Sequence, residues 1–255
     1  MTDAVRSLGF RAELRDFLRF VARPSFGPRL PGRVAMHGWV EDWFPSLRPG
    51  SLLRWAVVLW IVNLFFLGPL SLAAAMAGGA QSRLNLWNIP WVAALLWAPV
   101  VEELVFRYGL RHIAQALWLV PAALVAMLLG LRWYSVVLLV VVLAVCWIPV
   151  ALGWRVARRP LPWRWRRRYQ RAFPWVFHVS CLLFAGAHLA NFSYDSTPLW
   201  VMPFLVLPQW LTGVVLGWQR MRRGVGASML LHGIFNAGPL GMVWLVLHLA
   251  PHLMT

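Results

Sequence analysis

Residues 97–108 read Trp-Ala-Pro-Val-Val-Glu-Glu-Leu-Val-Phe-Arg-Tyr, and the rest of the fold has to be explained around this stretch. Two adjacent carboxylates, Glu102 and Glu103, and the guanidinium of Arg107 lie in a run that is otherwise as apolar as a membrane span. An ionised side chain in hydrocarbon costs at least ~2.5 to 3.5 kcal/mol, so such residues persist mainly where they pair or line a wet cavity. The stretch therefore predicts a buried polar site.

Helix geometry gives the two carboxylates different surroundings. Residues four apart share a helix face, so Glu103 and Arg107 can pair, whereas Glu102 points about 100° away and has no such local partner. A carboxylate that is free of a fixed partner in a buried site is suited to act as a general base. The residues alone leave open a structural ion pair with a spare carboxylate at the membrane interface.

The composition places the whole chain in the membrane class. Of its 255 residues 60% are hydrophobic, and the mean hydropathy is +0.65, well outside the usage of soluble globular domains. We therefore expect an all-α, polytopic membrane helix bundle in the cell (cytoplasmic) membrane. Cys146 and Cys181 both lie in apolar runs, which favours packing over a disulfide.

The positive charge follows the pattern of membrane topology. The formal net charge is +16, and every one of the 24 basic residues is an arginine. Most of them cluster in residues 1–54, 155–171 and 220–223, between the hydrophobic runs. This clustering is what the positive-inside rule expects of cytoplasmic segments beside anionic lipid. We expect a cytoplasmic N-terminus and anionic lipid at the basic segments, and no nucleic-acid partner.

The hydrophobic runs divide the chain into two parts. Residues 1–50 form a basic cytoplasmic segment, and residues 51–255 form the transmembrane domain. About seven runs approach the ~20 residues that a spanning helix needs; they are residues 52–77, 86–106, 110–130, 133–153, 173–191, 198–218 and 226–250. The loop with Asp195 and the tail 251–255 then fall outside the cell.

The N-terminal segment contains one regular pattern. Arginines recur every four residues from Arg11 to Arg23, while Leu14, Phe17 and Leu18 fall on another face. The pattern predicts an amphipathic helix at the membrane interface. A solvated basic helix with no lipid role is the equal alternative.

Two further polar pairs occur at helical spacing in later apolar runs. Phe184 and His188 lie four residues apart in the fifth run, and His232 and Asn236 lie four apart in the seventh. A lone intramembrane histidine is commonly a hydrogen-bonded core residue, but a face that carries both histidine and asparagine favours a shared site. In the sixth run Gly213 and Gly217 are spaced for close helix packing.

Three motifs now stand in order: Glu102-Glu103-x-x-x-Arg107, Phe184-x-x-x-His188 and His232-x-x-x-Asn236. Together they resemble the CPBP family of intramembrane proteases, the CAAX protease and bacteriocin-processing or Abi family. The resemblance covers residues of about 90 to 250, including the lead-in Ala98-Pro99.

The resemblance implies a role for each motif residue. Glu102 would activate water, and His188 would hold or polarise that water. Glu103 and Arg107 would orient the site, while His232 and Asn236 would stabilise the oxyanion.

Two departures from the family pattern concern the region after Arg107. Tyr108 stands where the family usually has glycine. Eighty residues separate Arg107 from His188, far more than the family needs. We interpret the excess as an inserted two-span hairpin at about 110–153 followed by a basic loop at 154–171.

The predicted spans place His188 more than ~10 Å from the depth of Glu102 along the membrane normal, because a helix rises 1.5 Å per residue. One of these two helices therefore cannot be a simple span.

Whether the site binds a metal ion is a separate question. Glu102, His188 and His232 are a ligand set that zinc uses in hydrolytic sites. The mechanism also works with a glutamate-activated water, and we expect no required cofactor, leaving zinc open as an alternative.

The sequence thus predicts an intramembrane endopeptidase that cleaves near a hydrophobic or lipidated segment of a membrane-associated peptide or protein. The alternative is a non-catalytic immunity or scaffold protein of the same family. A transporter would show repeated halves with broken helices, and the sequence has no such repeat.

Overall fold

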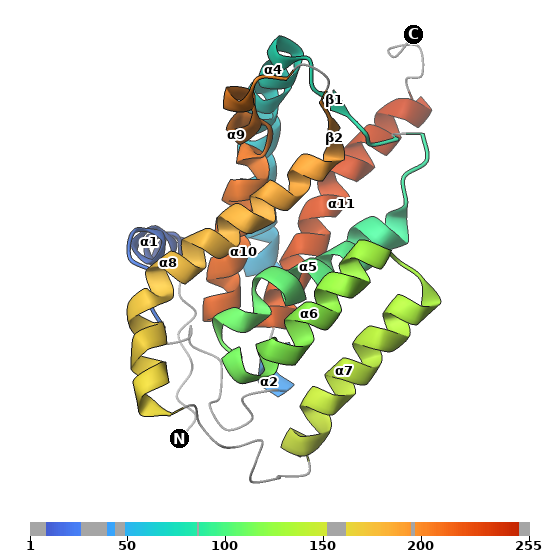
Figure 1. Cartoon of the computed structure of the whole chain (residues 1–255). Coiled ribbons are helices and arrows are strands. Elements are labelled where there is room, and N and C mark those ends of the chain that lie inside the picture. The colour runs from blue at the N-terminus through green and yellow to red at the C-terminus, as the bar shows by residue number, and fades with distance from the viewer. Residues whose placement is uncertain are drawn as a thin grey trace.

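The computed structural model describes residues 9–26, 40–43, 49–85, 87–151, 162–194 and 197–249. The predictions for residues 1–8, for residues 154–161 of the basic loop, for Asp195 and for the tail 251–255 fall outside these residues. The described part is nearly all-α, as predicted (Figure 1).

Among the residues that the structure describes, the regular elements are helical apart from one small β-ribbon. The helices are α1 (Phe10–Ala22), α2 (Val40–Trp43), α3 (Pro49–Val62), α4 (Gly68–Gly78), α5 (Ala98–Phe106), α6 (Ile113–Leu129), α7 (Trp133–Ala151), α8 (Trp163–Ala187), α9 (Met202–Leu205), α10 (Leu207–Arg222) and α11 (Val225–Leu249). Two π-helical turns, η2 (Asn63–Leu67) and η3 (Ala93–Trp97), lead into α4 and α5. Three 3₁₀ turns are η4 (Tyr108–Leu110), η5 (His188–Asn191) and η6 (Leu199–Val201). Strands β1 (Gln81–Ser82) and β2 (Phe192–Ser193) pair antiparallel.

Three continuous helices among the described residues are long and apolar enough to cross a membrane: Pro49–Gly78, Trp163–Asn191 and Val225–Leu249. The pair Leu199–Leu205 and Leu207–Arg222 would add a fourth span, bent by 46°. Ile113–Leu129 and Trp133–Ile148 are apolar but shorter. The molecule is therefore a membrane protein, while the count of seven spans and the cytoplasmic N-terminus remain predictions.

Two predicted boundaries were wrong. The predicted loop 154–171 is helical from Trp163 onward, because α8 begins there and runs through the arginines. Nothing between Trp163 and Arg171 breaks a helix, since neither glycine nor proline occurs in that stretch. The predicted span 86–106 is also shorter than expected, because its helix starts at residue 91 and changes to a π turn at residue 93.

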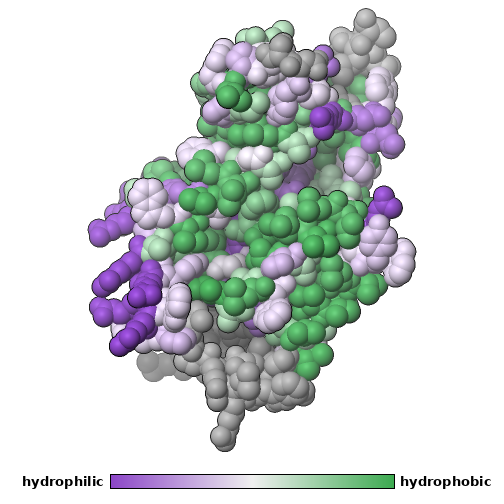
Figure 2. Space-filling view, in the orientation of Figure 1, coloured by the Kyte–Doolittle hydropathy of each residue, from purple (hydrophilic) through white to green (hydrophobic). Residues whose placement is uncertain are grey.

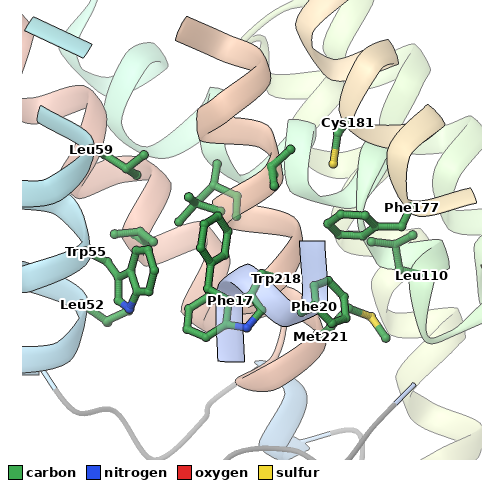
Figure 3. Close-up of a cluster of buried hydrophobic side chains, with 14 of the residues drawn as sticks. Phe17, Phe20, Leu52, Trp55, Leu59, Leu110, Phe177, Cys181, Trp218 and Met221 are labelled. Atoms are coloured by element: carbon green, nitrogen blue, oxygen red, sulfur yellow. The ribbon is translucent and has the colours of Figure 1, made fainter. Parts of the chain in front are cut away.

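The N-terminal helix packs into the bundle instead of lying beside it. Phe17 and Phe20 of α1 are buried, and Phe17 makes edge contacts with Trp55 of α3 and Trp218 of α10 (Figure 3). Leu14 and Leu18 of the predicted apolar face remain exposed. The helix itself is confirmed, and its predicted contact with lipid remains a prediction for the exposed part of that face.

Ion pairs fasten this N-terminal region to the end of α10. Arg222 pairs with Asp16, and the buried Arg223 pairs with the buried Glu13. Glu13 also accepts hydrogen bonds from Ser51 and from the indole of Trp55. Carboxylates before residue 50 therefore neutralise arginines near residue 220.

Helices α8 and α10 approach closely at the two glycines that the sequence singled out. A Cβ on Gly217 would lie 2.7 Å from the Phe177 ring, and one on Gly213 would lie 2.9 Å from the Phe184 ring. The prediction of close packing at these glycines is confirmed. Cys146 and Cys181 are both buried free thiols, as expected.

Helices α6 and α7 form an antiparallel pair beside α5 (Figure 1). Figure 2 shows apolar side chains over this pair, and it shows hydrophilic side chains gathered where Figure 1 places the start of α8. These two helices correspond to the predicted hairpin 110–153. Whether they are an insertion relative to the family stays a prediction.

Candidate active site

Proline shapes the entry to the helix that carries the carboxylates. The π turn η3 precedes α5, and the N–H of Ala98 donates to the carbonyl of Ala93, five residues back. The next residue, Pro99, has no N–H, so the carbonyl of Ala94 lacks the corresponding helical donor. That carbonyl instead accepts a hydrogen bond from Nδ2 of Asn236 on α11, at 2.9 Å. Asn236 therefore ties the entry of α5 to α11.

The predicted pair of Glu103 and Arg107 is present, and both side chains are fully buried. The Arg107 guanidinium also lies 4.0 Å from the centre of the Phe184 ring on α8. A planar guanidinium stacks well on an aromatic face, and the stacking is stronger where water is excluded. The first two motifs therefore meet through Arg107 and Phe184.

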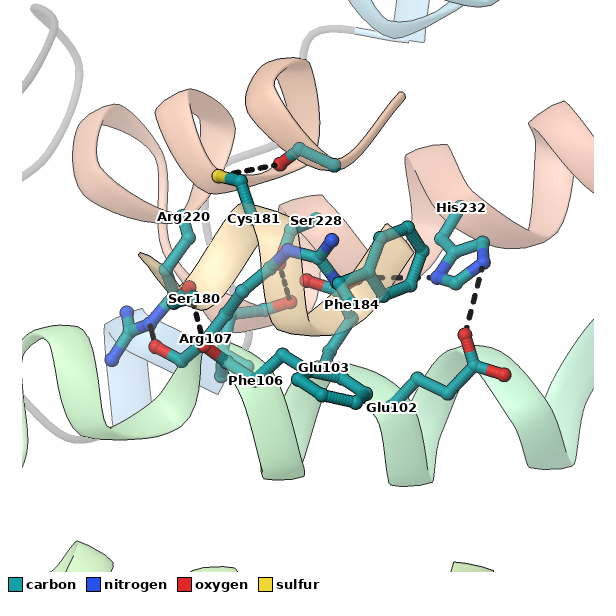
Figure 4. Close-up of polar contacts among 12 residues, drawn as sticks. Glu102, Glu103, Phe106, Arg107, Ser180, Cys181, Phe184, Arg220, Ser228 and His232 are labelled. Carbon is teal, nitrogen blue, oxygen red and sulfur yellow. Dashed lines mark hydrogen bonds and ion pairs between the residues drawn. The ribbon is translucent and has the colours of Figure 1, made fainter. Parts of the chain in front are cut away.

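Glu102 faces both predicted histidines, and Figure 4 shows it opposite His232. Its Oε2 lies 3.9 Å from Nε2 of His188 and 3.8 Å from Nε2 of His232. Its side chain is 18% exposed, whereas Glu103 is fully buried. The depth difference that two simple spans would give between His188 and Glu102 is therefore absent, in line with the inference that one of these helices is not a simple span. Instead, α8 extends ten residues further toward its N-terminus than predicted, and α5 has only nine residues after its π turn.

Hydrogen-bond partners assign the protons on both imidazole rings. Nδ1 of His188 lies 2.8 Å from the carbonyl of Phe184, and Nδ1 of His232 lies 3.1 Å from Oε1 of Glu103. A carbonyl and an ionised carboxylate can only accept, so each Nδ1 carries the donated proton. In a neutral ring, Nε2 is then a bare nitrogen, and both of these nitrogens face Glu102.

A cavity of about 700 Å³ contains the polar cluster. Glu102, His188, His232 and Asn236 line it, whereas Glu103 and Arg107 do not. Its remaining walls are mainly apolar side chains of α4, α10 and α11, and its rim reaches the β-ribbon. The structure therefore brings four of the six predicted residues to a shared space and places the other two behind them.

Sequence reasoning missed several polar residues of this cavity, and two of them have an unsatisfied side-chain oxygen. Asn63, at the start of η2, and Gln209, near the start of α10, both line it. Each has a side-chain carbonyl oxygen without a hydrogen-bond partner among the residues that the structure describes. A polar residue within an apolar run, followed five residues later by Gly68-Pro69, was the available signal for Asn63.

Glu102, His188 and His232 are the residues that could hold a zinc ion. Within the described ranges, no group of three or more histidine, cysteine, aspartate or glutamate side chains is arranged to hold a metal ion. Glu102, His188 and His232 do converge, with separations of 3.8 and 3.9 Å between facing atoms. The expectation that no cofactor is required, with zinc as the alternative, therefore stays a prediction.

These features define a class: a membrane-embedded helical protein with a glutamate and two histidines around a largely apolar cavity. The comparison with family models agrees, because the model described as Type II CAAX prenyl endopeptidase Rce1-like matches residues 152–238. The matched segment contains His188, His232 and Asn236. The match confirms the resemblance to the CAAX protease family that the three motifs indicated.

No curated protein and no solved structure matches the chain. The family match points to intramembrane CAAX protease activity and to a membrane-associated protein as substrate.

Proposed function

We propose that this protein is an intramembrane endopeptidase that hydrolyses a peptide bond near a hydrophobic or lipidated segment of a membrane-associated protein. The observation that carries the proposal is the convergence of Glu102, His188 and His232 on one cavity, with Nε2 of each histidine facing the same carboxylate oxygen. A fixed ion pair would explain Glu103 and Arg107, but it does not explain Glu102.

In the proposed reaction, Glu102 accepts a proton from a water of the cavity. The bare Nε2 of His188 accepts the other hydrogen bond of that water, because its Nδ1–H is already given to Phe184. The water oxygen then forms a bond to the carbonyl carbon of the peptide. Glu102 and His188 thus act on the nucleophile.

The carbonyl oxygen of the substrate becomes an oxyanion in this step. Asn236 has a second amide hydrogen, besides the one that it donates to Ala94, and it can donate this hydrogen into the cavity that it lines. His232 can donate from Nε2 when its ring carries a second proton, because its Nδ1 is already engaged with Glu103. Donors fixed at a developing charge are worth a few kcal/mol of barrier.

Collapse of the tetrahedral intermediate breaks the carbon–nitrogen bond. The proton held by Glu102 passes to the leaving nitrogen, which departs as an amine, and the new carboxyl group stays on the other product. Atoms and charges then balance with water as the only co-reactant. The proposal assigns no step to a metal.

The test compares wild-type protein with Glu102→Gln in cells. Terminal peptides of the membrane proteome are quantified by mass spectrometry, with equal membrane levels of the two proteins verified. A defined set of proteins is expected to keep an uncleaved terminal segment only with Glu102→Gln. Glu102→Gln is nearly isosteric and leaves the buried pair behind it intact.

The same experiment tests the alternative, a non-catalytic immunity or scaffold protein. That function predicts identical terminal peptides from the two strains and a biological effect that survives Glu102→Gln. Such a result would refute the protease proposal.

A further inference from the structure

The helix that carries Glu102 ends in hydrogen bonds from the following backbone and from side chains of two other helices. Helix α5 stops at Phe106, and the chain continues through the 3₁₀ turn η4. The last carbonyls of a helix lack helical donors and carry partial negative charge. In a membrane these carbonyls need donors from other elements, because water is scarce.

The backbone of the turn supplies part of this need: Leu110 N–H donates to the carbonyl of Arg107, and the N–H groups of Arg111 and His112 donate to the carbonyl of Tyr108. Side chains from two other helices add further donors. Ser180 of α8 donates to the carbonyl of Phe106 at 2.9 Å. The Nε of Arg220 donates to the carbonyl of Arg107 at 3.1 Å, and its Nη2 donates to the carbonyl of Tyr108 at 3.3 Å. Figure 4 shows Arg220 and Ser180 beside this end of α5.

Arg220 is in turn fixed by the N-terminal segment. Its Nη1 pairs with Oδ2 of Asp42 in the short helix α2, and both side chains are fully buried. Nε2 of His112, just after the 3₁₀ turn, lies 3.1 Å from the same Asp42 oxygen. Asp42 therefore contacts both Arg220, which caps the end of α5, and His112, which follows that end.

The position of α5 depends on its two ends, because a helix of nine residues is too short to be placed by spanning the membrane. Asn236 fixes the entry through Ala94, and Arg220 fixes the exit. Glu102 and Glu103 lie between these two anchors.

We infer that Asp42 and Arg220 form a positioning pair, through which the N-terminal segment sets the geometry of Glu102. The pair touches no reacting atom. It acts by holding the carbonyls of Arg107 and Tyr108, and through them the last turn of α5. The inference goes beyond the proposed function, because it makes a segment outside the three motifs part of the active-site scaffold.

The chain offers a matched control for this pair. Asp16 and Arg222 also join the N-terminal segment to α10, but their pair is partly exposed, and the Arg222 guanidinium lies over the Phe20 ring of α1. The experiment compares Asp42→Asn with Arg222→Gln in the purified full-length protein in lipid nanodiscs. Amide hydrogen exchange of residues 103–112 is measured first, and it does not depend on catalysis.

The second measurement is kcat and KM with a peptide in which a farnesylated cysteine is followed by three C-terminal residues. Asp42→Asn is expected to raise exchange in residues 103–112 and to lower kcat about tenfold or more with KM within about twofold, since small misplacements of a catalytic group cost rate. Arg222→Gln is expected to change neither. Arg220→Lys keeps the charge but replaces the guanidinium, which donates from several nitrogens, with a single ammonium group. It is expected to change exchange and kcat in the same direction as Asp42→Asn, but less.

Equal effects of Asp42→Asn and Arg222→Gln on exchange and on kcat would overturn the inference, as would no effect of Asp42→Asn on exchange. Should Arg220→Lys fail to fold, the isosteric Asp42→Asn still decides. Failure of the proposed function is distinguishable, because the exchange result stands even if Glu102→Gln leaves peptide cleavage unchanged.

Discussion

Nδ1 of His232 lies 3.1 Å from Oε1 of Glu103, the same carboxylate oxygen that pairs with Arg107. Glu103 is therefore shared between a cation on its own helix and a histidine of α11. This contact separates the two adjacent glutamates by role: Glu103 holds the site together, and Glu102 remains available to the cavity.

The first prediction concerns these two glutamates. Glu102→Gln should abolish peptide cleavage and leave the free energy of unfolding nearly unchanged. Glu103→Gln should destabilise the protein by roughly 3–5 kcal/mol, because Arg107 would be left as an uncompensated buried charge. Thermal unfolding of both variants in one detergent measures the difference. Equal losses of stability would contradict the division of roles.

The second prediction concerns Asn236. Asn236→Leu should lower kcat by about 10²-fold if its amide stabilises the oxyanion. The same change leaves the carbonyl of Ala94 without its donor, which should cost about 1–3 kcal/mol of stability.

A compensating change separates these two effects. Pro99→Ala adds an N–H that can donate to the carbonyl of Ala94. The double variant of Asn236→Leu and Pro99→Ala should therefore recover stability without recovering kcat. Unfolding temperature and single-turnover rate are the two measurements. Recovery of both would mean that Asn236 acts only on the helix.

The third prediction concerns the approach of α8 and α10. Gly217→Ala should destabilise the protein by about 1–3 kcal/mol through overpacking, because the new Cβ would lie 2.7 Å from the buried Phe177 ring. Gly241→Ala in α11 is the matched control, since a Cβ there meets nothing within 4 Å. It should be neutral or stabilising by up to about 1 kcal/mol. Denaturant or thermal unfolding distinguishes the two glycines, and equal effects would contradict close packing at Gly217.

The fourth prediction concerns the buried pair of Glu13 and Arg223. A double-mutant cycle with Glu13→Gln and Arg223→Gln should give a coupling free energy of about 1–3 kcal/mol, because contacting residues in one network are not additive. Each single change strands a buried charge, so the double variant should be less destabilised than the sum of the two. Additive losses would show that the contact between Glu13 and Arg223 contributes no coupling to the docking of α1.

The fifth prediction concerns metals. Incubation with 1,10-phenanthroline and subsequent removal of the chelator should leave the cleavage rate unchanged, because the proposed reaction uses a glutamate-activated water and assigns no step to a metal. Elemental analysis of the purified protein provides the second readout. A loss of rate that added zinc restores would refute this expectation.

The sequence alone determined several features that the structure confirmed. Hydropathy determined the helical membrane class, because long apolar runs are compatible only with helices whose backbone groups are satisfied internally. The spacing of four residues determined the pair of Glu103 and Arg107 and the close approach at Gly213 and Gly217, since both follow from helix periodicity. The three motifs also indicated the protease family before any geometry was known.

Only the tertiary structure decided the depth at which the motifs meet. Run lengths placed His188 far from Glu102, because hydropathy registers lipid-like segments and not the early start of α8 at Trp163 or the π turn before α5. The docking of α1 through Phe17, and of Asp42 onto Arg220, was likewise invisible in the sequence. The carboxylates and arginines that pair there lie about 180 to 210 residues apart along the chain. Local periodicity carries no information about such contacts, so their formation depends on the packing of the whole bundle.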